Sequence, residues 1–146
     1  MKSILMHTGR IMLALYFLAP GIGKFTAWDA NVALMEAHNM VMIPFLLAIA
    51  AVAQVAGSIS MLLNKYVAAC ALGFAAMTIL ININLHDFWN VYEGIDVKHE
   101  YQNFFKNLGI FAGLLLLAAV NLAVSYTHLR AHETEADLVC RLLLEK

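Results

Sequence analysis

Four long apolar segments are the feature of this sequence that most limits what the chain can fold into. They cover residues 4–25, 41–63, 66–86 and 104–124. Each is close to the ~20 residues that a helix needs to cross the hydrocarbon core of a bilayer. Their apolar residues do not alternate with the period of two that the strands of a membrane barrel show. Because lipid offers no hydrogen-bond partner to open backbone groups, the segments predict four spanning helices.

The composition of the chain supports a membrane environment. Hydrophobic residues make up 62% of the sequence and charged residues 13%, whereas soluble domains run nearer to about half and about a quarter. A chain of 146 residues is too short to enclose so much apolar surface in a water-soluble core. We therefore expect an all-α fold, a membrane-spanning antiparallel four-helix bundle over residues 1–124, in contact with the lipid bilayer. The net charge of −1 argues against nucleic acid as a partner.

The connections between the segments differ in length. Asn64 and Lys65 form a short turn, whereas residues 26–40 and 87–103 are longer. With four crossings, both long connections lie on the same side of the membrane, and their tryptophans suit the interface with water. Lysine and arginine divide evenly between the two sides, and we take both termini to be cytoplasmic. The first segment ends in PGIGK, not in a small-residue cleavage site, so we expect it to remain as a membrane anchor.

Small and polar residues recur at three- and four-residue spacing within each segment, which places them on one face of each helix. We expect these faces to meet inside the bundle, where small residues allow close approach and amides bond across helices. Arg10, Lys24 and Lys106 could instead reach the lipid headgroups. For Arg10 we expect an inward orientation, because Ala14 and Gly21 share its face. The faces comprise His7, Arg10, Ala14, Phe17, Gly21 and Lys24; Gln54, Gly57 and Ser58; Ala71, Ala75, Thr78, Asn82 and His86; and Asn103, Asn107, Gly109 and Gly113.

Several ionisable and aromatic residues are expected near the membrane face that carries the long connections. A histidine beside a carboxylate exchanges protons near neutral pH, and aromatic and cationic side chains could hold a flat redox-active headgroup such as a quinone. The types of His86, Asp87, His99 and Glu100 also suit a metal, but their spacing matches no zinc pattern, so we predict no metal site. No catalytic residue is assigned. The candidate ligand-binding residues are Arg10, Lys24, His86, Asp87, Trp89, Lys106 and Asn107.

Three stretches resemble the DoxX family: RIMLALYFLAPGIGK at 10–24, HDFW at 86–89 and QNFFKNLGIFAGLLL at 102–116. The resemblance spans residues 4–124. It implies a four-helix protein of the bacterial inner membrane, in a family named after a quinone-linked thiosulfate-oxidising enzyme, some of whose members partner soluble redox enzymes. Relatives often carry Glu before the glycines of the second helix, where this chain has Gln54. The missing carboxylate weakens any proton relay through that helix.

Three functions remain open from the sequence. The first is a redox-linked membrane subunit, an oxidoreductase component that binds no covalent cofactor and that binds a quinone or passes electrons with a soluble redox enzyme. The second is a non-catalytic scaffold or stress-response component that recruits a soluble enzyme. The third, a small-solute permease, is less favoured because the four segments show no inverted repeat.

The composition changes abruptly after Val124. Residues 125–146 contain SYTHLRAHET followed by LVCRLLLEK, and this stretch resembles translated read-through of a sequencing adapter. We therefore expect residues 125–146 to be a non-native tail. For that reason His128, His132 and Cys140 are not combined into a metal site.

Deleting residues 125–146 is expected to leave the thermal unfolding midpoint of the protein in detergent unchanged, because a non-native tail makes no packing contacts with the bundle. Circular dichroism of the full and shortened chains checks this. A fall of several degrees on deletion would show that the tail is native structure.

Overall fold

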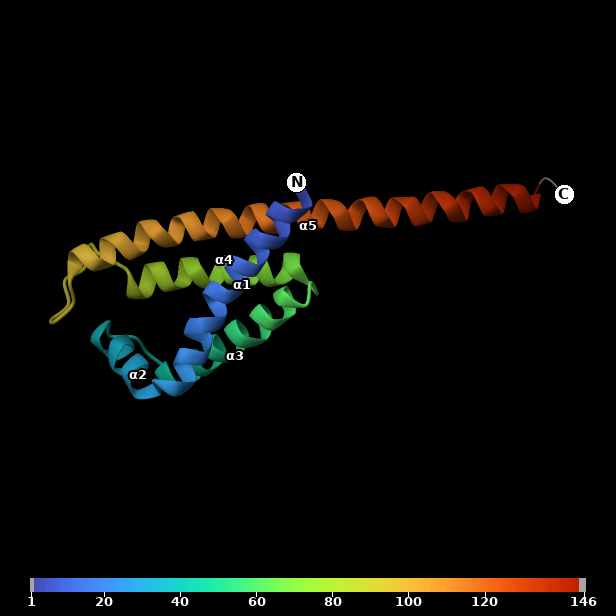
Figure 1. Cartoon of the computed structure of the whole chain (residues 1–146). Helices are drawn as coiled ribbons and strands as arrows, with labels where there is room; N and C mark the ends of the chain where they lie inside the picture. The colour runs from blue at the N-terminus through green and yellow to red at the C-terminus, as the bar shows by residue number, and fades with distance from the viewer. Residues whose placement is uncertain (1, 145–146) are drawn as a thin grey trace.

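The computed structural model describes the backbone of residues 2–144 and the side chains of residues 3–123. Within this part of the chain there are helices and no strands. Four helices are long and apolar enough to cross a membrane, over Ser3–Thr26, Ile43–Leu62, Val67–Leu85 and Val97–Ala123. The predicted all-α, four-span architecture is therefore confirmed (Figure 1). The helices are α1 (Lys2–Thr26), α2 (Trp28–Ala37), α3 (Ile43–Leu62), α4 (Val67–Leu85) and α5 (Val97–Leu144).

Two helix boundaries differ from the sequence-based expectation. Residues 26–40 were expected to be a connection, but most of them form α2, whose buried Met35 packs against Ile43 and Leu47. The helix α5 begins at Val97 and not at residue 104. The hydropathy of the sequence indicates where a helix enters the lipid and not where the helix begins. The first turns of α5 are polar, so they were not included in the predicted segment. The prediction that residues 125–146 make no packing contacts stays a prediction, because their side chains lie outside the described residues.

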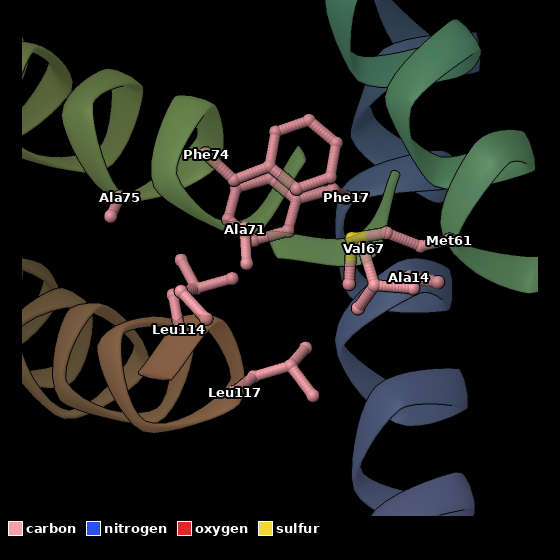
Figure 2. Packing of buried hydrophobic residues seen from close by; sticks show 10 residues of the cluster. Ala14, Phe17, Met61, Val67, Ala71, Phe74, Ala75, Leu114 and Leu117 are labelled. Carbon is pink, nitrogen blue, oxygen red and sulfur yellow. The ribbon is translucent and has the colours of Figure 1, made fainter. Parts of the chain in front are cut away.

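The spanning helices pack as two close pairs. α1 packs mainly against α3, and α4 packs mainly against α5. In Figure 1, α4 and α5 run side by side in opposite directions, while α1 crosses them at a steep angle. The pairs are joined in the core, where the rings of Phe17 and Phe74 stack with centroids 4.3 Å apart. Figure 2 shows this contact together with Met61 of α3 and Leu114 of α5.

Burial confirms most of the predicted inward faces. On α1, Arg10, Ala14 and Phe17 are at most 7% exposed, although His7 at the N-terminal end is exposed. The predicted faces of α3 and α4 are likewise inward, with Gln54, Ser58, Ala71, Ala75, Thr78 and Asn82 all buried.

The prediction that Gly109 and Gly113 form a helix–helix interface is wrong. A Cβ added at either glycine would meet nothing within 4 Å, so neither glycine allows a close helix approach. α5 instead buries Leu114, Leu117 and Ala118, a face centred away from the two glycines, although Leu117 lies next to Gly113. Side chains filling this face pack against α1 and α4 and leave the glycine face open.

Close approach does occur at Gly21 of α1. A Cβ there would lie 2.9 Å from Cβ of Gln54 and 3.3 Å from the backbone nitrogen of Val55. Both atoms are fixed to the backbone of α3, so neither can move aside without moving that helix. Gly21 therefore sets how closely α1 and α3 pack.

Replacing Gly21 by Leu is expected to destabilise the protein by about 1–3 kcal/mol, because the added side chain forces α1 away from α3. The matched control is Gly23→Leu, since a Cβ at Gly23 meets nothing within 4 Å on the same helix. The unfolding midpoint in detergent, followed by circular dichroism, compares the two variants. Equal midpoints would contradict the assigned contact.

Candidate functional site

A pocket of about 250 Å³ opens between the spanning helices at the end that carries the long connections. We call it the mouth pocket. Residues from α1, α3, α4 and α5 line it, together with His86 just after α4. The lining residues are Tyr16, Phe17, Pro20, Lys24, Gln54, Thr78, Ile81, His86, Asn103, Lys106 and Asn107.

Four of the seven predicted ligand-binding residues meet in this pocket: Lys24, His86, Lys106 and Asn107. Lys24 is half-buried, and no carboxylate lies within 4 Å of it among the described side chains. Lys106 donates from Nζ to Oδ1 of Asn103 at 2.7 Å. The two ammonium groups give the pocket a positive character, which favours an electron-rich oxygen of a ligand.

The carboxylate partner of His86 is Glu100 and not the adjacent Asp87. His86 follows the last turn of α4, Glu100 lies in the first turn of α5, and their side chains form an ion pair through Nδ1 and Oε2. Glu100 is 9% exposed, so the pair is largely removed from water. The pair places a histidine and a carboxylate together at the edge of the pocket.

Asp87 turns away from the mouth pocket and holds the connection between α4 and α5. Its Oδ2 accepts hydrogen bonds from Asn90 Nδ2 at 2.6 Å and from the Tyr92 hydroxyl at 2.7 Å. The hydrogen bond to Asp87 raises the pKa of Tyr92, so this hydroxyl stays protonated as a donor. The Tyr92 ring also lies 4.8 Å from the ring of His38, which joins the two long connections on one side as predicted.

Trp89 also lies outside the mouth pocket. It is 55% exposed and contacts the rings of Phe88 and Phe104 edge-on. Tyr101 and Phe105 extend this exposed aromatic group. Its position at a membrane face fits the interfacial belt expected from the sequence. The turn after His86, with a hydrogen bond from Asn90 N to Asp87 O, directs Trp89 away from the pocket.

Arg10 points inward as predicted, but it lies at the opposite end of the bundle from the mouth pocket. Its side chain is 7% exposed and donates from a terminal nitrogen to Oδ1 of Asn64, in the turn between α3 and α4. Arg10 therefore does not share a site with the other candidate residues.

A chain of buried amides supports the floor of the mouth pocket. Asn107 donates from Nδ2 to Oδ1 of Asn82 at 2.8 Å, and Asn82 donates onward to the backbone oxygen of Phe104 at 3.0 Å. The Tyr16 hydroxyl donates to Oδ1 of Asn107 at 3.5 Å. This network connects α1, α4 and α5, so Asn107 is held in place from two sides.

Gln54 supplies the least expected group of the pocket. It is 2% exposed, and its side-chain oxygen has no hydrogen-bond partner. An unpaired buried amide oxygen is costly, because its hydration is lost without replacement. Gln54 also lines the mouth pocket, so a buried acceptor without a partner lies beside that pocket.

Three participants of the site were not among the candidate ligand-binding residues predicted from the sequence: Glu100, Tyr16 and Gln54. Glu100 is fourteen positions beyond His86, and only the path of the connection brings them together. Tyr16 resembles any lipid-facing aromatic residue of a spanning helix. Gln54 was identified as polar glue, and nothing in its spacing indicated that its oxygen would stay unpaired. Among the described residues, no three His, Cys, Asp or Glu side chains are grouped to hold a metal ion.

Comparison with known proteins adds one finding. The sequence pattern of the DoxX family matches residues 5–87, which is more than half of the chain and includes the first three spanning helices. No curated protein matches the chain. No solved structure matches it. The resemblance noted at residues 102–116 lies beyond the matched range.

The family match covers the first three of the four helices that are able to span a membrane, so the sequence match and the fold agree. The chain therefore belongs to the DoxX family and is an integral membrane protein.

Proposed function

We propose that this chain is a redox-linked membrane subunit whose mouth pocket binds the headgroup of a lipid-soluble quinone. The observation that carries the proposal is the unpaired, buried oxygen of Gln54, a residue that lines the pocket together with Lys24 and Lys106. A ligand that both accepts and donates hydrogen bonds would satisfy all three groups. A quinone accepts through its carbonyl oxygens, and its reduced form also donates through hydroxyls.

The rest of the pocket suits a flat ring. Phe17, Pro20 and Ile81 provide apolar walls, while Lys24 and His86 contribute polar groups from the ends of α1 and α4. The volume of about 250 Å³ is just below the ~300–1,000 Å³ of sites for drug-sized ligands, so the pocket matches a headgroup with its tail left in the lipid.

The chain's own residues supply positioning and proton exchange. Lys24 on α1 would donate a hydrogen bond to a ring oxygen of the quinone, and Gln54 on α3 would accept one from a hydroxyl of its reduced form. His86, held by Glu100, exchanges a proton between the pocket and the water phase. The bound quinone supplies the two-electron chemistry.

A soluble redox enzyme is the proposed source or destination of electrons, and the bacterial inner membrane with cytoplasmic termini is the proposed location. Both proposals derive from the family resemblance, which is an argument by analogy.

The second candidate function is a scaffold that recruits a soluble enzyme without binding a quinone. One observation favours it: four exposed carboxylates, Asp29, Glu36, Glu93 and Asp96, lie on the connections of the mouth side. Such a surface would attract a basic partner, and the association would weaken with salt. A scaffold needs no ligand in the mouth pocket, so ligand binding separates the two functions.

Titrating the purified chain in neutral detergent with decylubiquinone, followed by calorimetry, tests the redox proposal. Lys24→Gln and Gln54→Leu are each expected to weaken binding by about tenfold or more, since each removes a hydrogen bond that involves a charged or otherwise unpaired group. The matched control is Lys98→Gln, because Lys98 is an exposed cation on the same side of the membrane and does not line the pocket.

Gln54→Leu also distinguishes a ligand role from a structural one. Without ligand it is expected to raise the unfolding midpoint, because it removes a buried unpaired oxygen. A variant that binds more weakly yet is more stable supports a ligand-directed role. Unchanged affinity in both Lys24→Gln and Gln54→Leu would refute the proposal and favour the scaffold.

A further inference from the structure

A second cavity lies farther along α1, toward its N-terminal end. It is a groove of about 500 Å³ between α1 and α5, and we call it the α1–α5 groove. Its walls are apolar or glycine except for Arg10 and Tyr16. The lining residues are Leu5, Met6, Gly9, Arg10, Met12, Leu13, Tyr16, Ile110, Gly113, Leu116, Leu117 and Val120.

Among the residues that line this groove Arg10 is the only cation, and no described carboxylate pairs with it. Its one hydrogen bond is to the neutral amide of Asn64, although a guanidinium has five N–H donors. Among the side chains of residues 3–123, no carboxylate lies within 4 Å of it. A charge that is 93% removed from water without an opposite charge is expensive in a membrane protein. An anion beside Arg10 would complete the site.

The hydrogen bond to Asn64 also sets the depth of Arg10 in the membrane. Asn64 belongs to the turn that joins two spanning helices, and Tyr66 at the end of this turn is 81% exposed. Turns between spans and exposed tyrosines lie at the boundary with water. Arg10 is therefore held near the lipid phosphates at this boundary; the groove extends from it past Leu13 and Tyr16 toward the hydrocarbon and past Met6 in the opposite direction.

We propose that the α1–α5 groove binds an anionic phospholipid, with its phosphate on Arg10 and one acyl chain along the groove. A fixed cation at phosphate depth above an apolar channel matches a molecule with one negative group and one long chain. A zwitterionic phospholipid carries the same phosphate, but its own ammonium group offsets the attraction. This inference does not depend on the function proposed for the mouth pocket.

The test compares two lipids on the purified full chain in dodecyl maltoside: dioleoyl phosphatidylglycerol and dioleoyl phosphatidylcholine. Native mass spectrometry counts the bound lipid, and the thermal unfolding midpoint reports the linked stabilisation. We expect phosphatidylglycerol to be retained and to raise the midpoint, and phosphatidylcholine to do neither. Equal retention of the two lipids would overturn the proposal.

Two pairs of variants distinguish lipid binding in the α1–α5 groove from nonspecific electrostatic attraction of the lipid to the protein. Arg10→Gln is expected to weaken phosphatidylglycerol binding by about tenfold or more. Its control is Lys65→Gln, which removes an exposed cation next to Asn64 at the same membrane boundary and should leave binding unchanged. A loss in Lys65→Gln as large as in Arg10→Gln would mean nonspecific attraction, and the proposal would fail.

The second pair keeps the test valid if Arg10→Gln does not fold. Gly113→Leu places a side chain into the groove without a clash, since a Cβ there meets nothing within 4 Å, and it should reduce lipid binding with Arg10 intact. Gly109→Leu adds the same side chain one turn earlier on α5, outside the groove, and should bind lipid like the wild type. Unchanged lipid binding in Gly113→Leu would refute the proposal.

Discussion

The hydrogen bond between Asn82 and Asn107 is the interaction on which the mouth end of the bundle depends. Both amides are buried, at 1% and 8% exposure, in a part of the chain where neither water nor lipid can replace a lost partner. Sliding α4 against α5 by one residue would break this bond and also the bond from Asn82 to the backbone oxygen of Phe104. The bond therefore sets the register of the two helices, and this register brings Lys106 of α5 and His86 at the end of α4 to the same pocket.

The second pair of helices is positioned by small residues and ring stacking. Gly21 allows α1 to approach α3, and Gly57 leaves room for Phe74, because a Cβ at Gly57 would lie 2.8 Å from that ring. Phe74 in turn stacks on Phe17, which ties α1 to α4. Because α1 uses this face for packing against α3, its contact with α5 is slight, and the α1–α5 groove results.

Sequence reasoning recovered what periodicity and hydropathy determine, namely the four spans and the inward faces that carry Ala14 and Asn82. It did not recover what the path of a connection determines. Asp87 is next to His86 in sequence, yet the chain turns after α4 and gives His86 the distant Glu100 as its partner. The short helix α2 was not predicted because it does not cross the membrane and has no long apolar run. Gly109 and Gly113 have the spacing of a helix interface, but that spacing does not say which face of α5 meets the bundle.

The grouping of Arg10 with Lys24 illustrates the same difficulty in one helix. The two cations share a face of α1, and their shared periodicity suggested one site. Along a helix, however, fourteen residues correspond to about 21 Å at ~1.5 Å per residue, a large part of the ~30 Å hydrocarbon thickness. A single small ligand does not bridge that distance. The two cations therefore lie near opposite membrane boundaries. Between them on α1, Tyr16 is the one residue that lines both the mouth pocket and the α1–α5 groove.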